Sequence, residues 1–150
     1  MSLGAKEIGE LISLTLTIPT VLLGVAVVIQ WWPAASRAAR SRKLLTGSEW
    51  FIIGVATSFA GSVADNLYWS TAWVESFLYG DITATWAFQN GAWTNIVFRQ
   101  GVGIFAAFCH LRAAELAVTP ASRFVNRLLV VAYTSCFVFG TVLLFLRQSP

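Results

Sequence analysis

Two long uncharged apolar segments most constrain what this chain can fold into. Residues 11–32 carry no charged side chain over 22 positions, and residues 128–146 carry none over 19. A helix rises about 1.5 Å per residue and a bilayer's hydrocarbon core is about 30 Å thick, so each segment can cross a membrane. The whole chain is 57% hydrophobic and only 11% charged, unlike an average soluble domain. We therefore expect an integral membrane protein, with a buried soluble bundle as the alternative.

Two further apolar segments are equally long but contain ionisable side chains. The four segments together predict a compact all-α bundle in one domain, residues 1–150, whose transmembrane helices cover about 9–32, 48–74, 91–117 and 120–147. The connections predicted between them are a basic cytoplasmic loop at 33–47 and an aromatic-rich outer loop at 75–90.

Several short patterns indicate where these helices begin or bend. Thr46 and Glu49 have the spacing of a capping box, and Thr119 before Pro120 is typical of a helix start. Pro19 should kink the first helix. The N-terminal residues MSLGAKEIGE mix both charges, so we expect no cleavable signal peptide.

Basic residues are distributed unequally between the two sides of the predicted bundle. Seven lie in or beside the first and third connections: Arg37, Arg40, Arg42, Lys43, Arg112, Arg123 and Arg127. On the opposite side we count only Lys6 and Arg147 outside the membrane. Cytoplasmic loops carry the excess of Lys and Arg, so both termini should face away from the cytoplasm. A bacterial cytoplasmic (inner) membrane is the expected location.

The tryptophans support the same orientation. All seven fall near predicted helix ends, where an indole buries its ring and keeps its N–H hydrated. The cytoplasmic belt would hold Trp31, Trp32 and Trp50, and the outer belt Trp69, Trp73, Trp86 and Trp93.

Asp65 and Arg99 are ionisable residues inside the second and third predicted helices. Counting by helical rise places both about 10 Å below the outer interface. Because an isolated charge in hydrocarbon is costly, we predict that they pair. Asn66, Tyr68 and Gln100 would be polar neighbours of this pair. The pair could fix the register of the helices; proton or ion movement and the binding of a partner or ligand are the alternatives.

Small residues accompany these charges at helical spacing. Gly54, Ser58, Gly61 and Asp65 step by four, three and four, and so do Arg99, Gly103, Ala106 and His110. Each set shares one helix face, and faces of small residues let transmembrane helices approach closely. The same count places His110 near Gly54.

His110 is the single histidine of the chain. A small residue one turn earlier, Ala106, would allow a haem or chlorophyll-type pigment to lie against the helix with His110 as axial ligand. The alternative is a histidine satisfied by a neighbouring hydroxyl or reaching the interface. We expect no other cofactor and no metal site. Cys109 and Cys136 are interpreted as small apolar core residues.

No pattern in the sequence predicts catalysis. It contains no intramembrane acid pair, phosphate loop or CxxC motif, so we expect a protein that is not an enzyme. Nor do aromatic residues interleave with the basic cluster Arg37 to Lys43, so no nucleic-acid partner is expected. That cluster should instead orient the protein and contact anionic lipids.

These expectations leave three functions open. The first is a structural or accessory subunit of a larger membrane assembly, in contact with lipid and with other subunits. The second is a homo-oligomeric pore, either holin-like or an ion or proton channel that uses Asp65 and Arg99. The third is a haem or pigment carrier through His110. The first two differ in whether Asp65 faces the inside of one chain or the space between chains.

Overall fold

The structure is a computed structural model that describes residues 5–41, 43–80, 89, 97 and 100–148. These residues form an all-α bundle of four helices. Their bounds are α1 Ala5–Arg40, α2 Gly47–Tyr79, α5 Val102–Glu115 and α6 Pro120–Gln148.

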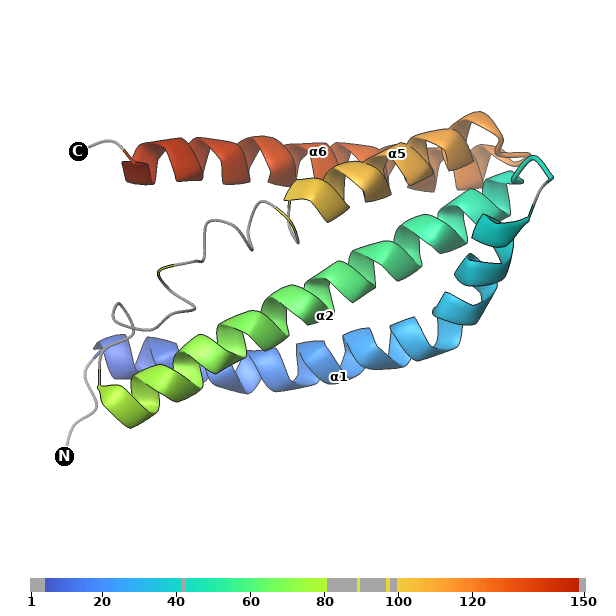
Figure 1. Cartoon of the computed structure of the whole chain (residues 1–150). Helices are drawn as coiled ribbons and strands as arrows, with labels where there is room; N and C mark the ends of the chain where they lie inside the picture. The colour runs from blue at the N-terminus through green and yellow to red at the C-terminus, as the bar shows by residue number, and fades with distance from the viewer. Residues whose placement is uncertain (1–4, 42, 81–88, 90–96, 98–99, 149–150) are drawn as a thin grey trace.

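Helices that follow one another in the chain pack side by side: α1 lies on α2, α2 on α5, and α5 on α6 (Figure 1). The turn between α1 and α2 lies beside the turn between α5 and α6. A Cβ at Gly47 would stand 3.0 Å from the carbonyl oxygen of Leu116. Both chain termini lie at the opposite end of the bundle (Figure 1).

The starts predicted for the second and fourth helices are confirmed in α2 and α6, whereas α1 begins at Ala5, earlier than predicted. Most of residues 91–101, where the third helix was predicted to begin, lie outside the described residues. Glu49 Oε2 accepts the backbone N–H of Thr46 at 2.8 Å, and Thr46 Oγ1 accepts the N–H of Glu49 at 3.3 Å, which is a reciprocal capping box. Thr119 Oγ1 accepts the N–H of Ser122 at 3.2 Å, and Pro120 is the first residue of α6.

Two helix ends were predicted wrongly. Helix α1 continues from residue 33 to Arg40, because Pro33 is accommodated inside the helix and Ala35 and Ala38 beyond it are buried. The last turns of α1 bend away from the rest of the helix (cyan in Figure 1), as expected where a proline removes a backbone hydrogen bond. Helix α2 runs past residue 74 to Tyr79 and ends before Gly80, whose φ of 80° suits a left-handed C-terminal residue.

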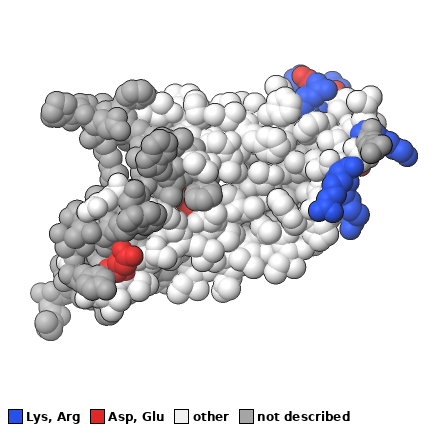
Figure 2. All heavy atoms as spheres, in the orientation of Figure 1, with Lys and Arg blue, Asp and Glu red and all other residues white. Residues whose placement is uncertain are grey.

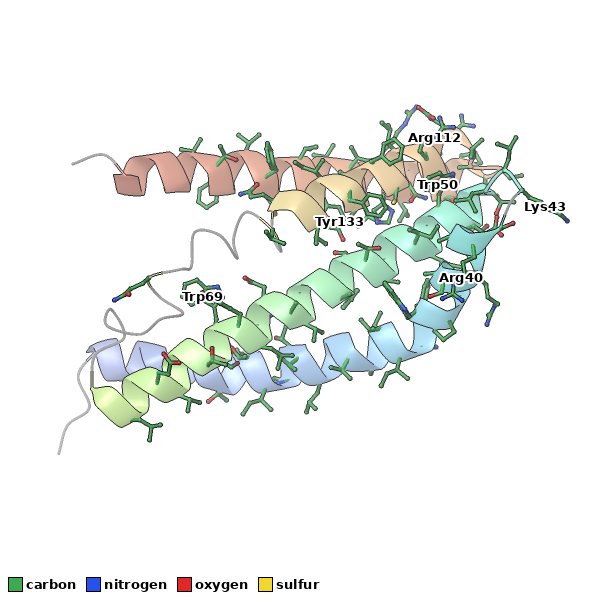
Figure 3. All side chains as sticks on the ribbon, viewed as in Figure 1. Arg40, Lys43, Trp50, Trp69, Arg112 and Tyr133 are labelled. Atoms are coloured by element: carbon green, nitrogen blue, oxygen red, sulfur yellow. The ribbon has the colours of Figure 1, made fainter. Side chains whose placement is uncertain are left out.

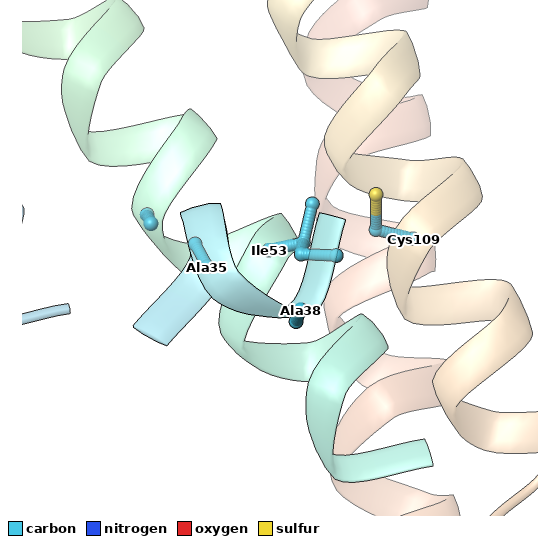
Figure 4. Close-up of a cluster of buried hydrophobic side chains, with 5 residues drawn as sticks. Ala35, Ala38, Ile53 and Cys109 are labelled. Carbon is cyan, nitrogen blue, oxygen red and sulfur yellow. The ribbon is translucent and has the colours of Figure 1, made fainter. Parts of the chain in front are cut away.

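The buried apolar core consists of small side chains. It contains Ala35, Ala38, Ile53, Ala56 and Cys109, contributed by α1, α2 and α5 (Figure 4). Glycines bring the same helices close together. A Cβ at Gly24 would lie 2.6 Å from Val63, and one at Gly61 would lie 2.6 Å from Val102.

Large apolar side chains are found mostly outside the bundle. Among the described residues, two helices could cross a membrane by length and composition: the part of α1 from Thr15 to Arg40 and the part of α6 from Pro120 to Val142. In the apolar 18-residue window of each, only 6% is buried. Leucine, isoleucine, valine and phenylalanine side chains along both are exposed. The interior instead holds four buried polar residues among those described: Asp65, Gln100, His110 and Asn126.

Candidate functional site

His110 lies at the centre of a buried polar cluster between α2, α5 and α6. Its side chain is fully buried (0% exposed), and Nδ1 lies 3.0 Å from Oδ1 of Asn126, which is 2% exposed. The amide nitrogen of Asn126 donates to the carbonyl oxygen of Ser122 at 2.9 Å. That bond fixes the amide orientation, so Oδ1 accepts and Nδ1 of His110 donates. The other ring nitrogen, Nε2, then carries the lone pair of the neutral imidazole.

Aromatic rings enclose the imidazole. Tyr133 of α6 stacks on it with ring centroids 5.7 Å apart and planes at 6°, and Phe51 of α2 meets it edge-on at 5.5 Å. The Tyr133 hydroxyl donates to Oγ of Ser58. Three helices are thus joined by one small network of side chains (Tyr133 is labelled in Figure 3). Its geometry specifies how α6 lies against α2 and α5.

The expected proximity of His110 and Gly54 is observed. A Cβ at Gly54 would lie 3.0 Å from Nε2 of His110 and 3.0 Å from Cβ of Cys109. Nε2 therefore faces the backbone of α2 and has no hydrogen-bond partner among the described residues. A macrocycle could reach Nε2 only if α2 and α5 separated, and Ala106, one turn earlier, is itself fully buried. The arrangement does not favour the haem or pigment site.

A second polar layer lies nearer the terminal end of the bundle. Asp65 of α2 is 4% exposed and Gln100 is 8% exposed, so both side chains face the inside of the chain. The amide nitrogen of Gln100 lies 2.4 Å from where a Cβ of Gly140 would stand, so this amide occupies the space beside a glycine of α6. Arg99 lies outside the described residues, and the Asp65–Arg99 pair therefore stays a prediction.

The polar neighbours predicted for this layer have local partners. Asn66 donates its amide to the carbonyl oxygen of Ser62 at 2.8 Å, within its own helix. Tyr68 packs edge-on against Trp69, with ring centroids 5.7 Å apart.

The small residues predicted to pack between helices divide into two groups. Gly54 and Gly61 stand at close helix contacts, Ser58 accepts the tyrosine hydroxyl, and Ala106 is buried. Gly103 was expected to behave alike, but a Cβ there would meet no described atom within 4 Å. Cys136 also departs from its predicted place in the core, because it lies exposed on α6, while Cys109 is buried as predicted.

The described tryptophans lie towards the two ends of the bundle. Trp50 lies at the end that holds Arg40 and Lys43, whereas Trp69 lies towards the other end (Figure 3). Trp31 packs edge-on against Phe51 across the α1–α2 contact, and neighbouring Trp32 is exposed. Trp73 is in α2, and Trp86 and Trp93 lie outside the described residues.

Positive charge gathers at one end of the molecule (Figure 2). The basic residues whose side chains the structure describes all belong to the turns at that end or to the adjoining helix ends: Arg37, Arg40, Lys43, Arg112, Arg123 and Arg127. Arg112 forms an ion pair with Glu115 in the same helix. Arg123 donates to the carbonyl oxygen of Ala117 at 3.4 Å. This charged end is opposite the end where both termini lie (Figures 1 and 2).

The part of the chain that the structure describes contains no group of three metal-ligating side chains. The polar clusters join helices and present no nucleophile paired with a base. No family model, curated protein or solved structure matches the chain.

Sequence reasoning missed the contribution of α6 to the His110 cluster. Asn126, Tyr133 and Gly140 recur every seven residues, which places them on one face of that helix. The structure turns this face inward: Asn126 meets His110, Tyr133 meets Ser58, and Gly140 meets Gln100. The heptad spacing of two polar residues and a glycine in an apolar helix was the signal that could have found it.

Proposed function

We propose that this chain is an integral membrane protein of four transmembrane helices that serves as a non-catalytic structural or accessory subunit of a larger membrane assembly. The observation that carries this proposal is the distribution of polarity in the bundle. Large apolar side chains cover the outside of α1 and α6, while Asp65, Gln100, His110 and Asn126 are inside. In water such a surface would aggregate, whereas in lipid it is the stable arrangement.

The two candidate spans support a membrane position for the other helices as well. Helix α2 packs along α1 after a short turn, and α5 packs between α2 and α6. With α1 and α6 proposed to span the membrane, these contacts support the same depth for α2 and α5. Helices α2 and α5 carry the buried polar residues Asp65 and His110, so their own sequences need less apolar character than those of α1 and α6.

The orientation follows from the charged end. Six described basic residues and only two described acidic ones, Glu49 and Glu115, lie there. The positive-inside tendency directs this end towards the cytoplasm and both termini to the other side.

The burial of Asp65 favours a structural subunit over a homo-oligomeric pore. A pore lined by this carboxylate needs it on a surface shared between chains, yet Asp65 is 4% exposed within a single chain. The polar network of His110, Asn126, Tyr133 and Ser58 is likewise internal. Such a bundle presents mainly apolar helix faces to its surroundings, as a subunit that docks against other membrane helices does.

Alkaline carbonate extraction followed by native mass spectrometry tests the proposal. We expect the full chain to remain with the membrane and, after gentle detergent extraction from its own membrane, to appear in a defined heteromeric mass without visible absorbance. Release by carbonate would contradict the membrane position. A ring of identical chains that passes ions after reconstitution would establish the pore instead, and a bound chromophore would establish the carrier.

A further inference from the structure

The outer face of α6 carries a feature that the proposed function leaves unused. A shallow hollow of about 420 Å³ lies on it, lined by the described residues Thr134, Ser135, Val138, Phe139 and Val142. The hollow is mostly apolar and is an open depression along the helix, since all five lining residues belong to α6. It faces away from the bundle, because Asn126, Tyr133 and Gly140 occupy the opposite face of the same helix.

Two arginines lie on the same side of the helix, nearer its N-terminus. Arg127, Val131, Ser135, Val138 and Val142 step by four, four, three and four, so they share one stripe of α6. Arg123 is one turn before Arg127, and both are exposed. No carboxylate among the described residues pairs with either, in contrast to Arg112, which Glu115 neutralises. Exposed Phe124 and Leu128 lie beside them.

Two arginines followed along the helix by an apolar stripe match the anionic headgroup and acyl chain of a phospholipid. A phosphate accepts hydrogen bonds from guanidinium groups, and the acyl chain needs an apolar surface that continues from the headgroup into the membrane. The stripe from Arg127 to Val142 is about 22 Å long by helical rise, which exceeds the roughly 15 Å depth of one leaflet's hydrocarbon. We propose that the outer face of α6 binds one anionic phospholipid, with its phosphate at Arg123 and Arg127 and an acyl chain along Val131 into the hollow at Ser135 and Val138.

This proposal rests on the membrane position proposed above and adds a ligand class and a site to it. It differs from a general attraction of the basic end for an anionic leaflet, because it assigns the lipid to α6 and to one stripe of residues. Arg37 and Arg40 on α1 provide the matched comparison, since they are also exposed and lie at the same end.

The test is native mass spectrometry of the full chain with equal amounts of phosphatidylglycerol and phosphatidylcholine. We expect the protein to retain one phosphatidylglycerol. The double variant Arg123→Gln/Arg127→Gln should weaken that binding about 25-fold, since each arginine near an anionic surface contributes about fivefold. The variant Val138→Trp, which fills the outward-facing hollow without touching the core, should also lose the lipid. The double variant Arg37→Gln/Arg40→Gln should keep it.

Three results would overturn the site. Equal loss in both arginine double variants would mean that only the overall charge attracts the lipid. Equal retention of the two lipids would mean that no anionic site exists. A dimer that Val138→Trp dissociates, without bound lipid, would assign the hollow to a second copy of the chain. Carbonate extraction of the same samples separates these results from failure of the membrane position, in which case the protein would leave the membrane altogether.

Discussion

At the scale of single residues, the hydrogen bond between Nδ1 of His110 and Oδ1 of Asn126 connects two helices through two buried polar side chains. The imidazole Nδ1 donates to Asn126, whose own amide is held by the Ser122 carbonyl. Both side chains are buried, so neither can exchange its partner for water. The Tyr133 ring stacks on the imidazole and limits the angle at which it can sit. We therefore infer that the main role of this pair is to fix the rotation of α6 about its own axis.

Replacing Asn126 tests that role. Asn126→Ala leaves the N–H of His110 buried without an acceptor, and we expect the free energy of unfolding to fall by about 1–2 kcal/mol, as for other interhelical hydrogen bonds in membranes. Thermal unfolding in detergent, followed by circular dichroism, measures the change. Ser122→Ala is the control, because Asn126 uses only its backbone carbonyl. Equal effects of the two substitutions would refute the assignment.

The sequence predicted part of this cluster and missed the rest for a clear reason. Spacing along α2 and α5 placed His110 beside Gly54, since both helices were counted from the same predicted layer. The rotation of α6 had no such reference, because its only charged residues lie towards its ends. No role was therefore predicted for Asn126 or Tyr133, although their spacing of seven would have revealed the inward face.

At the scale of helices, close approach depends on which glycines meet a neighbour. Gly61 faces Val102, whose β-branched side chain has few rotamers with which to yield, and a Cβ would lie 2.6 Å from it. Gly103 meets no described atom within 4 Å. The two glycines lie on adjacent helices, but we expect opposite changes in stability when each is replaced by alanine.

Alanine at each glycine distinguishes them. We expect Gly61→Ala to lower the free energy of unfolding by about 1–3 kcal/mol, because the added methyl group overpacks the α2–α5 contact. Gly103→Ala should instead raise it by about 0.5–1 kcal/mol, because alanine loses less backbone entropy in a helix. Unfolding in detergent reports both. Similar losses in the two variants would mean that Gly103 also lies at a helix contact.

The capping box of α2 makes a further prediction at this scale. Thr46→Ala removes the hydroxyl that accepts the N–H of Glu49 and leaves a helix start without its side-chain cap. We expect a loss of about 1 kcal/mol in the free energy of unfolding. Thr46→Ser preserves the hydroxyl and should behave like the unaltered chain in the same unfolding measurement. A loss of equal size in Thr46→Ser would show that the cap does not account for the effect.

Local patterns predicted the starts of α2 and α6 better than the end of α1. The capping pairs at Thr46 and Thr119 need only residues close in sequence, and both were found as expected. The end of α1 depends on tertiary contact instead. Pro33 alone favours an ending, but burial of Ala35 and Ala38 against α2 keeps the following turns helical. That contact joins residues far apart in the sequence, so local patterns do not predict it.

At the scale of the whole molecule, polarity changes from the inside of the bundle to the outside, whereas charge changes along the bundle axis. Polar side chains lie inside and apolar ones outside across the bundle, whereas along its axis the described cations gather at one end and the termini at the other. A soluble protein has no reason for the axial division. A membrane accounts for both arrangements. Lipid favours apolar side chains on the outside of the bundle, and the cytoplasmic side favours cations at one end.

The axial division predicts which sites a membrane-impermeant maleimide can reach on intact cells. Cys109 is buried and Cys136→Ala removes the exposed thiol, so this background should stay unlabelled. In it, a cysteine appended after Pro150 should label on intact cells, because the proposed orientation directs the terminal end away from the cytoplasm. Ser41→Cys, at the exposed turn beside Arg40 and Lys43, should label only after permeabilisation. The reverse pattern would mean that the basic end lies outside, and the charge at that end would then require an anionic protein partner there instead of the cytoplasmic leaflet.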